Sequence, residues 1–181
     1  MNRIKEERKS LVIAVVIIAV IGFTLNYSCV SAEYYSNMVD AYNTVLNEFV
    51  EGEEAAELIH DVWYNAIWDW SNKDTYKYVK GTDDFNEALE NLFADKNFVK
   101  RMESIGNNMS GTLSLMNTLN HPPEQYEEAY QNLKALYDFY FDYRSLTTNP
   151  KGRTIMEFTE EYNDFEQKIL KKMADVQLHF D

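Results

Sequence analysis

The sequence predicts an all-α fold: an antiparallel bundle of four long helices and one short helix, preceded by an N-terminal hydrophobic export or anchor helix. Three observations support this prediction. Apolar residues recur at alternating spacings of four and three along most of the chain, as on a helix face that packs in a bundle. No stretch of useful length alternates like a β-strand. Only six glycines and three prolines interrupt 181 residues, which leaves room for few turns.

The N-terminal region, residues 1–32, is a basic stub followed by a signal or anchor segment. Residues 1–9 carry four basic and two acidic side chains, and the run 11–25 is apolar and uncharged. Basic residues before such a run predict a cytoplasmic N-terminus. We therefore expect residues 33–181 to form one extracytoplasmic helical-bundle domain, which is long enough to bury a core of its own.

The stretch GFTLNYSCVSAEYY, residues 22–35, contains the ends of three export signals. A prepilin site is excluded because its glycine precedes the hydrophobic helix, whereas Gly22 lies near the end of this one. A lipoprotein signal would place lipid on Cys29, the single cysteine, although the residues two and three places before it are bulky and polar. The third signal is a signal-peptidase site, because Val30 and Ala32 suit cleavage before Glu33.

We adopt an uncleaved anchor as the interpretation of this segment, with lipidation and cleavage as alternatives. The apolar run 11–25 is short for a membrane span, yet it lies at the upper limit for the core of a signal peptide. The predicted location is the cell membrane, with a single pass. A lipoprotein or a secreted protein is the alternative location.

The first helix of the domain is predicted over residues 34–71. Gly52 falls on its apolar face, so the helix is expected to pass through this glycine, with a kink there as the alternative. The two tryptophans on this face, Trp63 and Trp70, are predicted to lie in the core. The apolar series consists of Met38, Tyr42, Val45, Phe49, Gly52, Ala56, Ile59, Trp63, Ala66 and Trp70.

The polar residues 71–84 are predicted to form a loop, and Thr82 or Asp83 to cap a short helix that carries Phe85, Leu89 and Leu92. A break over residues 94–97 precedes a long helix. Consecutive prolines end that helix at residues 120–123. Its apolar series consists of Phe98, Met102, Ile105, Met109, Thr112, Met116 and Leu119.

Two further helices complete the bundle, separated by a turn at residues 148–152. The first is expected to bury Tyr126, Ala129, Leu133, Leu136, Tyr137 and Tyr140. The second has the clearest apolar series, which consists of Ile155, Phe158, Tyr162, Phe165, Ile169, Met173 and Val176.

Three stretches, LIHDVWYNAIW, DDFNEALENLF and PPEQYEEAYQNLKALYDFYFDYRSLTTNPKG, resemble a group of uncharacterised exported or lipoprotein-like helical proteins of Gram-positive bacteria. The resemblance covers most of residues 37–178, and its motifs mark helix faces and turns. It implies a location and a fold. It implies no activity and no site residues.

The negative charge of the chain excludes anionic partners. The chain has 17 basic and 30 acidic side chains, a formal net charge of −13. Nucleic acid and anionic lipid head groups would repel such a domain, so we expect neither as a ligand. The membrane is expected to be a partner only through the N-terminal segment.

No pattern for catalysis or cofactor binding is present, and we expect a protein that is not an enzyme and has no cofactor. The sequence lacks G-x-S-x-G, and its three histidines are scattered. Glu57 and His60 form one E-x-x-H unit, but a di-iron bundle needs two such units and two further glutamates. We therefore predict no metal site.

Aromatic side chains are the remaining candidates for a binding surface. Tyr64 and Trp68, four residues apart, point away from the apolar face of the first helix, and Phe139 projects off that of a later helix. These three residues form the candidate surface for a protein partner or for self-association. The alternative for Tyr64 and Trp68 is that the bundle has a wide apolar stripe and that another helix covers them. The predicted function is a membrane-tethered interaction or structural module. The alternative is a glycan-binding or small-ligand-binding module that uses the aromatics near Trp68.

Overall fold

The computed structural model describes residues 29–148, 150 and 152–180, and every regular element in them is helical. This confirms the prediction of an all-α protein. The hydrophobic run 11–25 lies outside the described residues, so its insertion, lipidation and cleavage all stay predictions. Within the described part, none of the helices combines the length and the apolar character that a membrane crossing needs.

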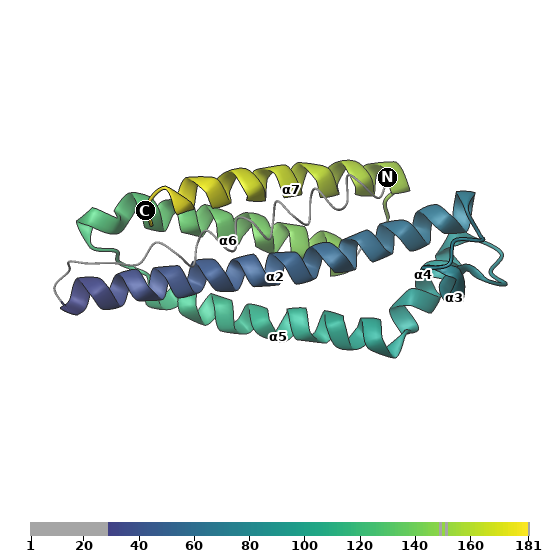
Figure 1. Ribbon diagram of the computed structural model, residues 1–181, viewed down its shortest axis with the longest axis horizontal. Helices are drawn as coiled ribbons and strands as arrows, with labels where there is room; N and C mark the ends of the chain where they lie inside the picture. The colour runs from purple at the N-terminus through teal and green to yellow at the C-terminus, as the bar shows by residue number, and fades with distance from the viewer. Residues whose placement is uncertain (1–28, 149, 151, 181) are drawn as a thin grey trace.

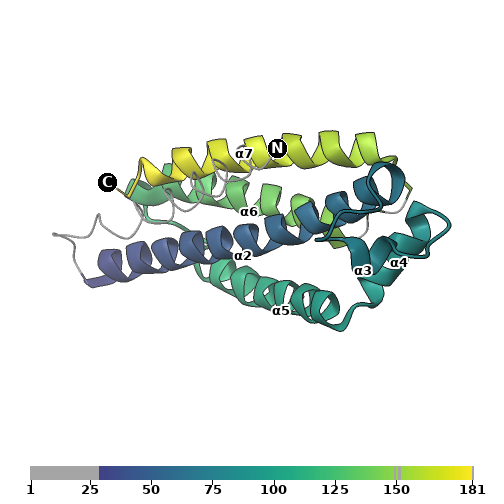
Figure 2. The same ribbon diagram turned by 45° about the vertical axis from the view of Figure 1, so that its right-hand side comes forward.

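Four long helices lie side by side along the length of the molecule (Figures 1 and 2). They are α2 (Cys29–Trp68), α5 (Lys96–Thr118), α6 (Glu127–Thr148) and α7 (Ile155–Gln177). Consecutive long helices run in opposite directions, so α2 and α6 point one way and α5 and α7 point the other way.

Two short helices, α3 (Tyr76–Val79) and α4 (Phe85–Ala94), lie at the end of the bundle where α2 ends (Figure 1). The sequence predicts a loop where α3 forms, but this single turn buries Tyr78 and Val79. Four residues are too few to show a helical period, so the pattern did not reveal them. A 3₁₀ turn, Glu124–Tyr126, leads into α6.

Aspartates cap both α4 and α5. Asp84, one residue beyond the predicted caps, accepts hydrogen bonds from the backbone N–H groups of Asn86 and Glu87 at 2.7 and 3.1 Å. The predicted break over residues 94–97 is a single residue in the structure, Asp95. Its side chain caps α5 by accepting hydrogen bonds from the backbone N–H groups of Asn97 and Phe98. A capping carboxylate satisfies N–H groups that have no partner within the helix.

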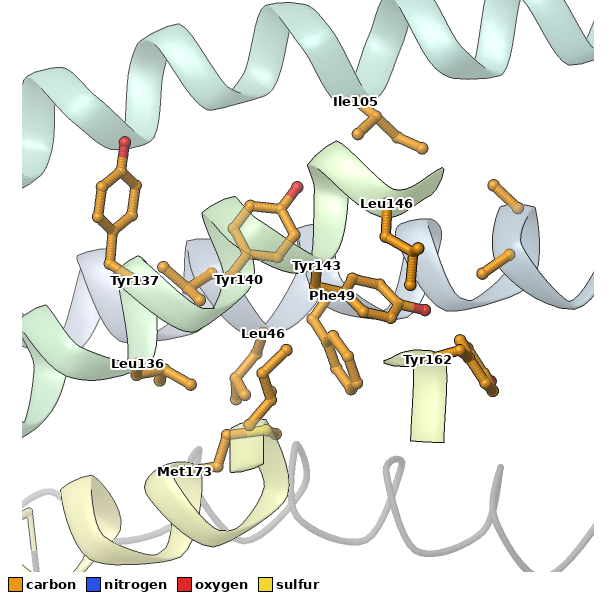
Figure 3. Packing of buried hydrophobic residues seen from close by; sticks show 14 of the residues in the cluster. Leu46, Phe49, Ile105, Leu136, Tyr137, Tyr140, Tyr143, Leu146, Tyr162 and Met173 are labelled. Atoms are coloured by element: carbon orange, nitrogen blue, oxygen red, sulfur yellow. The ribbon is translucent and has the colours of Figure 1, made fainter. Parts of the chain in front are cut away.

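The core is rich in tyrosine, and one glycine makes room for part of it. α2 continues without interruption through Gly52, whose missing Cβ would lie 3.4 Å from Cε1 of Tyr143. The ring of Tyr143 is fully buried between Phe49 and Tyr162, at centroid distances of 5.3 and 5.9 Å (Figure 3). Gly52 therefore belongs to the α2–α6 packing.

The end of α2 differs from the prediction. The helix stops at Trp68, and Trp70 lies in the following turn with 71% of its surface exposed, so its predicted place in the core is wrong. Trp63 is buried, as predicted. Asn65 donates a hydrogen bond to the Thr75 hydroxyl at 2.9 Å, and both residues are buried. This contact holds the chain against α2 just after the helix ends, which requires the backbone to turn at residues 69–72.

Candidate docking surface

Three aromatic side chains form a ladder along α2. His60, Tyr64 and Trp68 are four residues apart, a spacing that places them on one face of the helix. The rings of His60 and Tyr64 are stacked at 5.9 Å, and those of Tyr64 and Trp68 lie 4.7 Å apart at an angle of 41°. The ladder therefore presents a continuous strip of ring surface near the end of the helix.

The ladder forms one wall of a shallow hollow between α2 and α7. The first two turns of α7 supply the other wall, with Ile155, Met156, Thr159 and Glu160. The hollow has a volume of about 290 Å³. We call it the α2–α7 hollow. Trp68 is 58% exposed and Met156 is 71% exposed, so two large apolar side chains border it while facing solvent.

A capping box fixes the wall that α7 provides. The Thr154 hydroxyl accepts a hydrogen bond from the backbone N–H of Glu157 at 3.2 Å, and the Glu157 carboxylate accepts one from the backbone N–H of Thr154 at 2.8 Å. These hydrogen bonds lower the pKa of Glu157, because they favour its charged form. The start of α7 is thus fixed, and with it the position from which Met156 projects.

The α2–α7 hollow is weakly acidic. Glu160 lines it, and the Asp61 carboxylate lies 3.3 Å from Nδ1 of His60. No lysine or arginine is among the described residues that line it. A ligand or partner with a positive charge at its edge would therefore meet complementary charge.

The hollow lies at the end of the bundle where α2 ends, and this end has a concentration of exposed apolar side chains. Of the ten large apolar residues that are exposed in the described part of the chain, five fall between residues 64 and 76, and Met156 adds a sixth at this end. We call this set the distal aromatic patch; it consists of Tyr64, Ile67, Trp68, Trp70, Tyr76 and Met156. α2 has 40 residues, so the patch lies up to about 60 Å from the start of the helix.

The structure brings together only part of the predicted surface. Tyr64 and Trp68 are exposed and in contact. Phe139 is partly buried and packs against the core, and it does not line the hollow. Cys29 is the first residue of α2, and its lipidation stays a prediction.

Sequence reasoning missed the α7 wall of the hollow. Met156 and Glu160 lie more than eighty residues from Trp68, and no local pattern links them. One signal was present: Met156 falls off the apolar series that runs from Ile155 to Phe158, so an exposed methionine could have been expected there.

A second hollow, of about 440 Å³, also escaped prediction because distant segments line it. Trp63 and three α4 side chains, Phe85, Leu89 and Phe93, form its apolar part, and Trp63 stacks on Phe85 at 5.6 Å. Arg153 borders it but is paired with Glu161 at 3.0 Å. This pairing leaves the hollow without a free positive charge for a ligand.

In the described residues, no group of three or more His, Cys, Asp or Glu side chains is arranged to hold a metal ion. Comparisons of the chain with protein-family models, with curated proteins and with solved structures found no match. The resemblance to exported helical proteins therefore stays an expectation.

Proposed function

We propose that this protein is a non-enzymatic, membrane-tethered extracytoplasmic module that binds another protein through its distal aromatic patch. One observation carries the proposal: most of the large apolar side chains that the described chain exposes gather at one end of the bundle. Scattered single apolar residues on a surface need no explanation, but a concentration of them is typical of an interaction site.

The residue types support a protein partner. Tryptophan, tyrosine and methionine are enriched in protein–protein interfaces, and tryptophan and tyrosine often supply most of the binding energy. The patch supplies two tryptophans, two tyrosines and a methionine. A second copy of this chain is a less suitable partner, because each copy carries a formal charge of −13 and Glu160 borders the hollow. We therefore propose a partner with basic residues around an apolar centre.

The position of the patch supports a tethered function. In the proposed arrangement the anchor precedes α2, and the patch lies at the opposite end of that helix. A rigid helix of about 60 Å would hold the docking surface away from the lipid and accessible to a partner in the cell envelope.

The docking test is site-specific photocrosslinking in a Gram-positive host. A photoreactive phenylalanine analogue replaces Met156, and in a control it replaces Leu113, which is 48% exposed on α5. We expect a discrete heterologous product from position 156 that Trp68→Ala removes, and no product from position 113. Equal products from both positions, or a product that Trp68→Ala leaves unchanged, would contradict docking at the patch.

The tether needs its own measurement, by intact mass and membrane fractionation of the protein from the same host. A full-length, membrane-bound species supports the uncleaved anchor. A lipid-modified species that begins at Cys29 keeps the tether but changes its chemistry. A soluble species that begins at Glu33 contradicts the tether and leaves docking to be judged by crosslinking alone.

A glycan is the second candidate ligand, favoured by the ladder of His60, Tyr64 and Trp68. Stacked rings bind the apolar faces of sugars, and Thr159 and Glu160 could accept or donate hydrogen bonds at the edge. This alternative predicts that Trp68→Ala abolishes binding to soluble cell-wall fragments while the far-UV circular dichroism spectrum is retained. Unchanged binding in the variant would exclude the ladder as a sugar platform.

A further inference from the structure

A third hollow is lined by residues of α4, α5 and α6, and it shares no residue with the distal aromatic patch. Its volume is about 590 Å³. Among the described residues that line it, Arg144 on α6 is the only lysine, arginine or histidine. The apolar part of the lining consists of Phe93, Phe98, Val99 and Met102. We call it the Arg144 hollow.

The guanidinium of Arg144 reaches from α6 to α5. Its Nη1 donates a hydrogen bond to Sδ of Met109 at 3.0 Å. Its Nη2 lies beside Gly106, where a Cβ would be only 3.2 Å away, so the glycine leaves room for the guanidinium. Gly106 and Arg144 both line the hollow, and Arg144 is half-buried. The charged end of the side chain therefore belongs to the wall of the hollow.

This guanidinium has no oxygen acceptor in the described structure. A guanidinium has five N–H donors, and the thioether sulfur that takes one of them is a weak acceptor. The other two arginines of the described chain pair with carboxylates, Arg101 with Glu54 at 3.4 Å and Arg153 with Glu161 at 3.0 Å. A partly buried charge costs free energy unless an opposite charge compensates it, so Arg144 is suited to an anion from outside.

Two carboxylates of the protein face Arg144, and neither forms an ion pair with it in the described structure. Glu48 on α2 is only 2% exposed and accepts a hydrogen bond from the Thr112 hydroxyl. Burial is the main influence on the pKa of Glu48, which it raises, and the charge of Arg144 is the weakest of the influences that lower it. Glu103 lines the hollow but is exposed to solvent. The guanidinium thus keeps donors for a ligand.

We propose that the Arg144 hollow binds an amphipathic monocarboxylate, whose carboxylate pairs with Arg144 and whose apolar part packs against Phe93 and Phe98. The planar fork of a guanidinium matches the two oxygens of a carboxylate. The rings of Phe93 and Phe98 meet edge to face at 5.3 Å and offer a rigid apolar surface. The volume of the hollow lies within the range of about 300–1,000 Å³ that is typical of small-molecule sites.

The charge of the lining favours a monoanion. Arg144 supplies one positive charge, and Glu103 adds a negative one. A phosphate monoester carries a charge of about −1.5 to −2 at pH 7, which a single guanidinium does not neutralise. The whole chain, at a formal charge of −13, would repel such a dianion further. A carboxylate carries one charge, which Arg144 balances.

The test is fluorine NMR of the full chain in detergent micelles, with para-fluorohydrocinnamate as the probe at 150 mM NaCl. We expect saturable broadening of the probe signal beyond that in empty micelles. The primary amide of the probe keeps its shape without the charge, and it should bind about tenfold more weakly or worse. Acetate lacks the apolar part, and it should compete with the probe only at much higher concentration.

Substitutions then assign the binding to the hollow. Arg144→Gln should weaken binding of the probe about tenfold or more, because it removes the charged donors. The matched control is Arg101→Gln, which removes the same charge from α5 outside the hollow and should leave affinity within about twofold. Glu103→Gln should strengthen binding, because it removes a negative charge from the lining. Circular dichroism shows whether each variant is folded, and the comparison of acid with amide on the wild type needs no variant.

Each of four results would overturn the proposal. The first is the absence of saturable binding of the acid to the wild type, and the second is equal affinity for the acid and its amide. The third is equal weakening by Arg144→Gln and Arg101→Gln, which would reflect only the overall charge. The fourth is competition by acetate as strong as that by the unlabelled acid. None of these results depends on docking at the distal aromatic patch, so this site and the proposed function are tested separately.

Discussion

Two buried tyrosines differ in what their hydroxyl groups contribute to the core. The Tyr42 hydroxyl, on α2, donates to the backbone carbonyl of Met173 at 3.3 Å. The Tyr143 hydroxyl is buried without a partner in the described structure. A buried hydroxyl without a hydrogen bond loses its hydration and gains nothing in return. Tyr143 therefore stabilises through its ring, whereas Tyr42 stabilises through both its ring and its hydroxyl.

We predict that Tyr143→Phe stabilises the protein by about 1 kcal/mol, because it removes an unpaired buried hydroxyl and keeps the ring. Tyr42→Phe should destabilise it by about 1 kcal/mol, because the Met173 carbonyl loses its donor. Urea unfolding followed by circular dichroism measures both changes. A loss of stability in Tyr143→Phe as large as that in Tyr42→Phe would contradict the assignment.

The buried Glu48 makes stability depend on pH. Its pKa is raised in the folded protein above the ordinary value of 4.5, so the folded state binds its proton more tightly than the unfolded state does. The resulting stabilisation is fully present below about pH 4.5 and is lost as the pH rises through the folded-state pKa. Glu48→Gln cannot titrate and lacks this dependence.

We therefore predict that Glu48→Gln is more stable than the wild type at pH 7. Relative to the variant, the wild type should gain stability as the pH falls, down to about pH 4.5. Urea unfolding of both proteins at several pH values gives the difference, in which the titration of the other acids largely cancels. A constant difference between pH 7 and pH 4.5 would show that Glu48 titrates normally.

At the scale of elements, α2 organises the bundle, because it contacts every other α-helix of the described chain. Tyr34 and Tyr35 near its start donate to the carbonyls of Leu119, after α5, and Phe180, after α7, at 2.8 and 3.0 Å. Gly52 near its middle admits the ring of Tyr143. Its sequence thus serves several neighbours at once.

Substitutions at Gly52 should separate helix propensity from packing. Gly52→Ala should be neutral or stabilise by up to about 1 kcal/mol, because alanine favours helix and its Cβ meets Tyr143 at 3.4 Å, an ordinary contact. Gly52→Leu should destabilise by roughly 1–3 kcal/mol or more, because the larger side chain overlaps the ring. Thermal unfolding of both variants checks this. Similar stability of the two would mean that α6 moves easily.

At the scale of the whole molecule, a large net charge is combined with a concentration of exposed apolar side chains. The chain carries a formal charge of −13, while most of the large apolar side chains that are exposed in the described residues lie where α2 ends. Negative charge keeps the bundle soluble but repels itself in the compact state. Added salt screens this repulsion, since the Debye length falls from about 30 Å at 0.01 M to about 3 Å at 1 M.

We predict that raising NaCl from 10 to 500 mM stabilises the full chain. A gain of about 1 kcal/mol corresponds to a rise in Tm of roughly 2–4 °C for a protein of this length. Differential scanning calorimetry at constant pH measures it. A fall in Tm with salt would show that ion pairs such as Lys77–Asp95, at 2.9 Å, outweigh the repulsion.

Much of the fold could be read from the sequence. The alternation of four and three predicts each long helix, and most members of each predicted series are buried. The place of Tyr64 and Trp68 off the apolar face left two arrangements open, exposure or cover by another helix, and in the structure both residues are exposed. The helices and their apolar faces are local features, because the period of the helix and the side chains on it determine them.

Tertiary structure decided the rest. α2 ends at Trp68, so Trp70 lies outside the core, and Phe139 is partly buried against the core instead of exposed. The α7 wall of the hollow and the burial of Glu48 beside Thr112 join residues that are 64 or more positions apart. The sequence by itself determined which segments are helical and which face of each is apolar. Only the folded bundle decided which polar and aromatic groups meet, because those meetings depend on helix ends and on neighbours that no local period encodes.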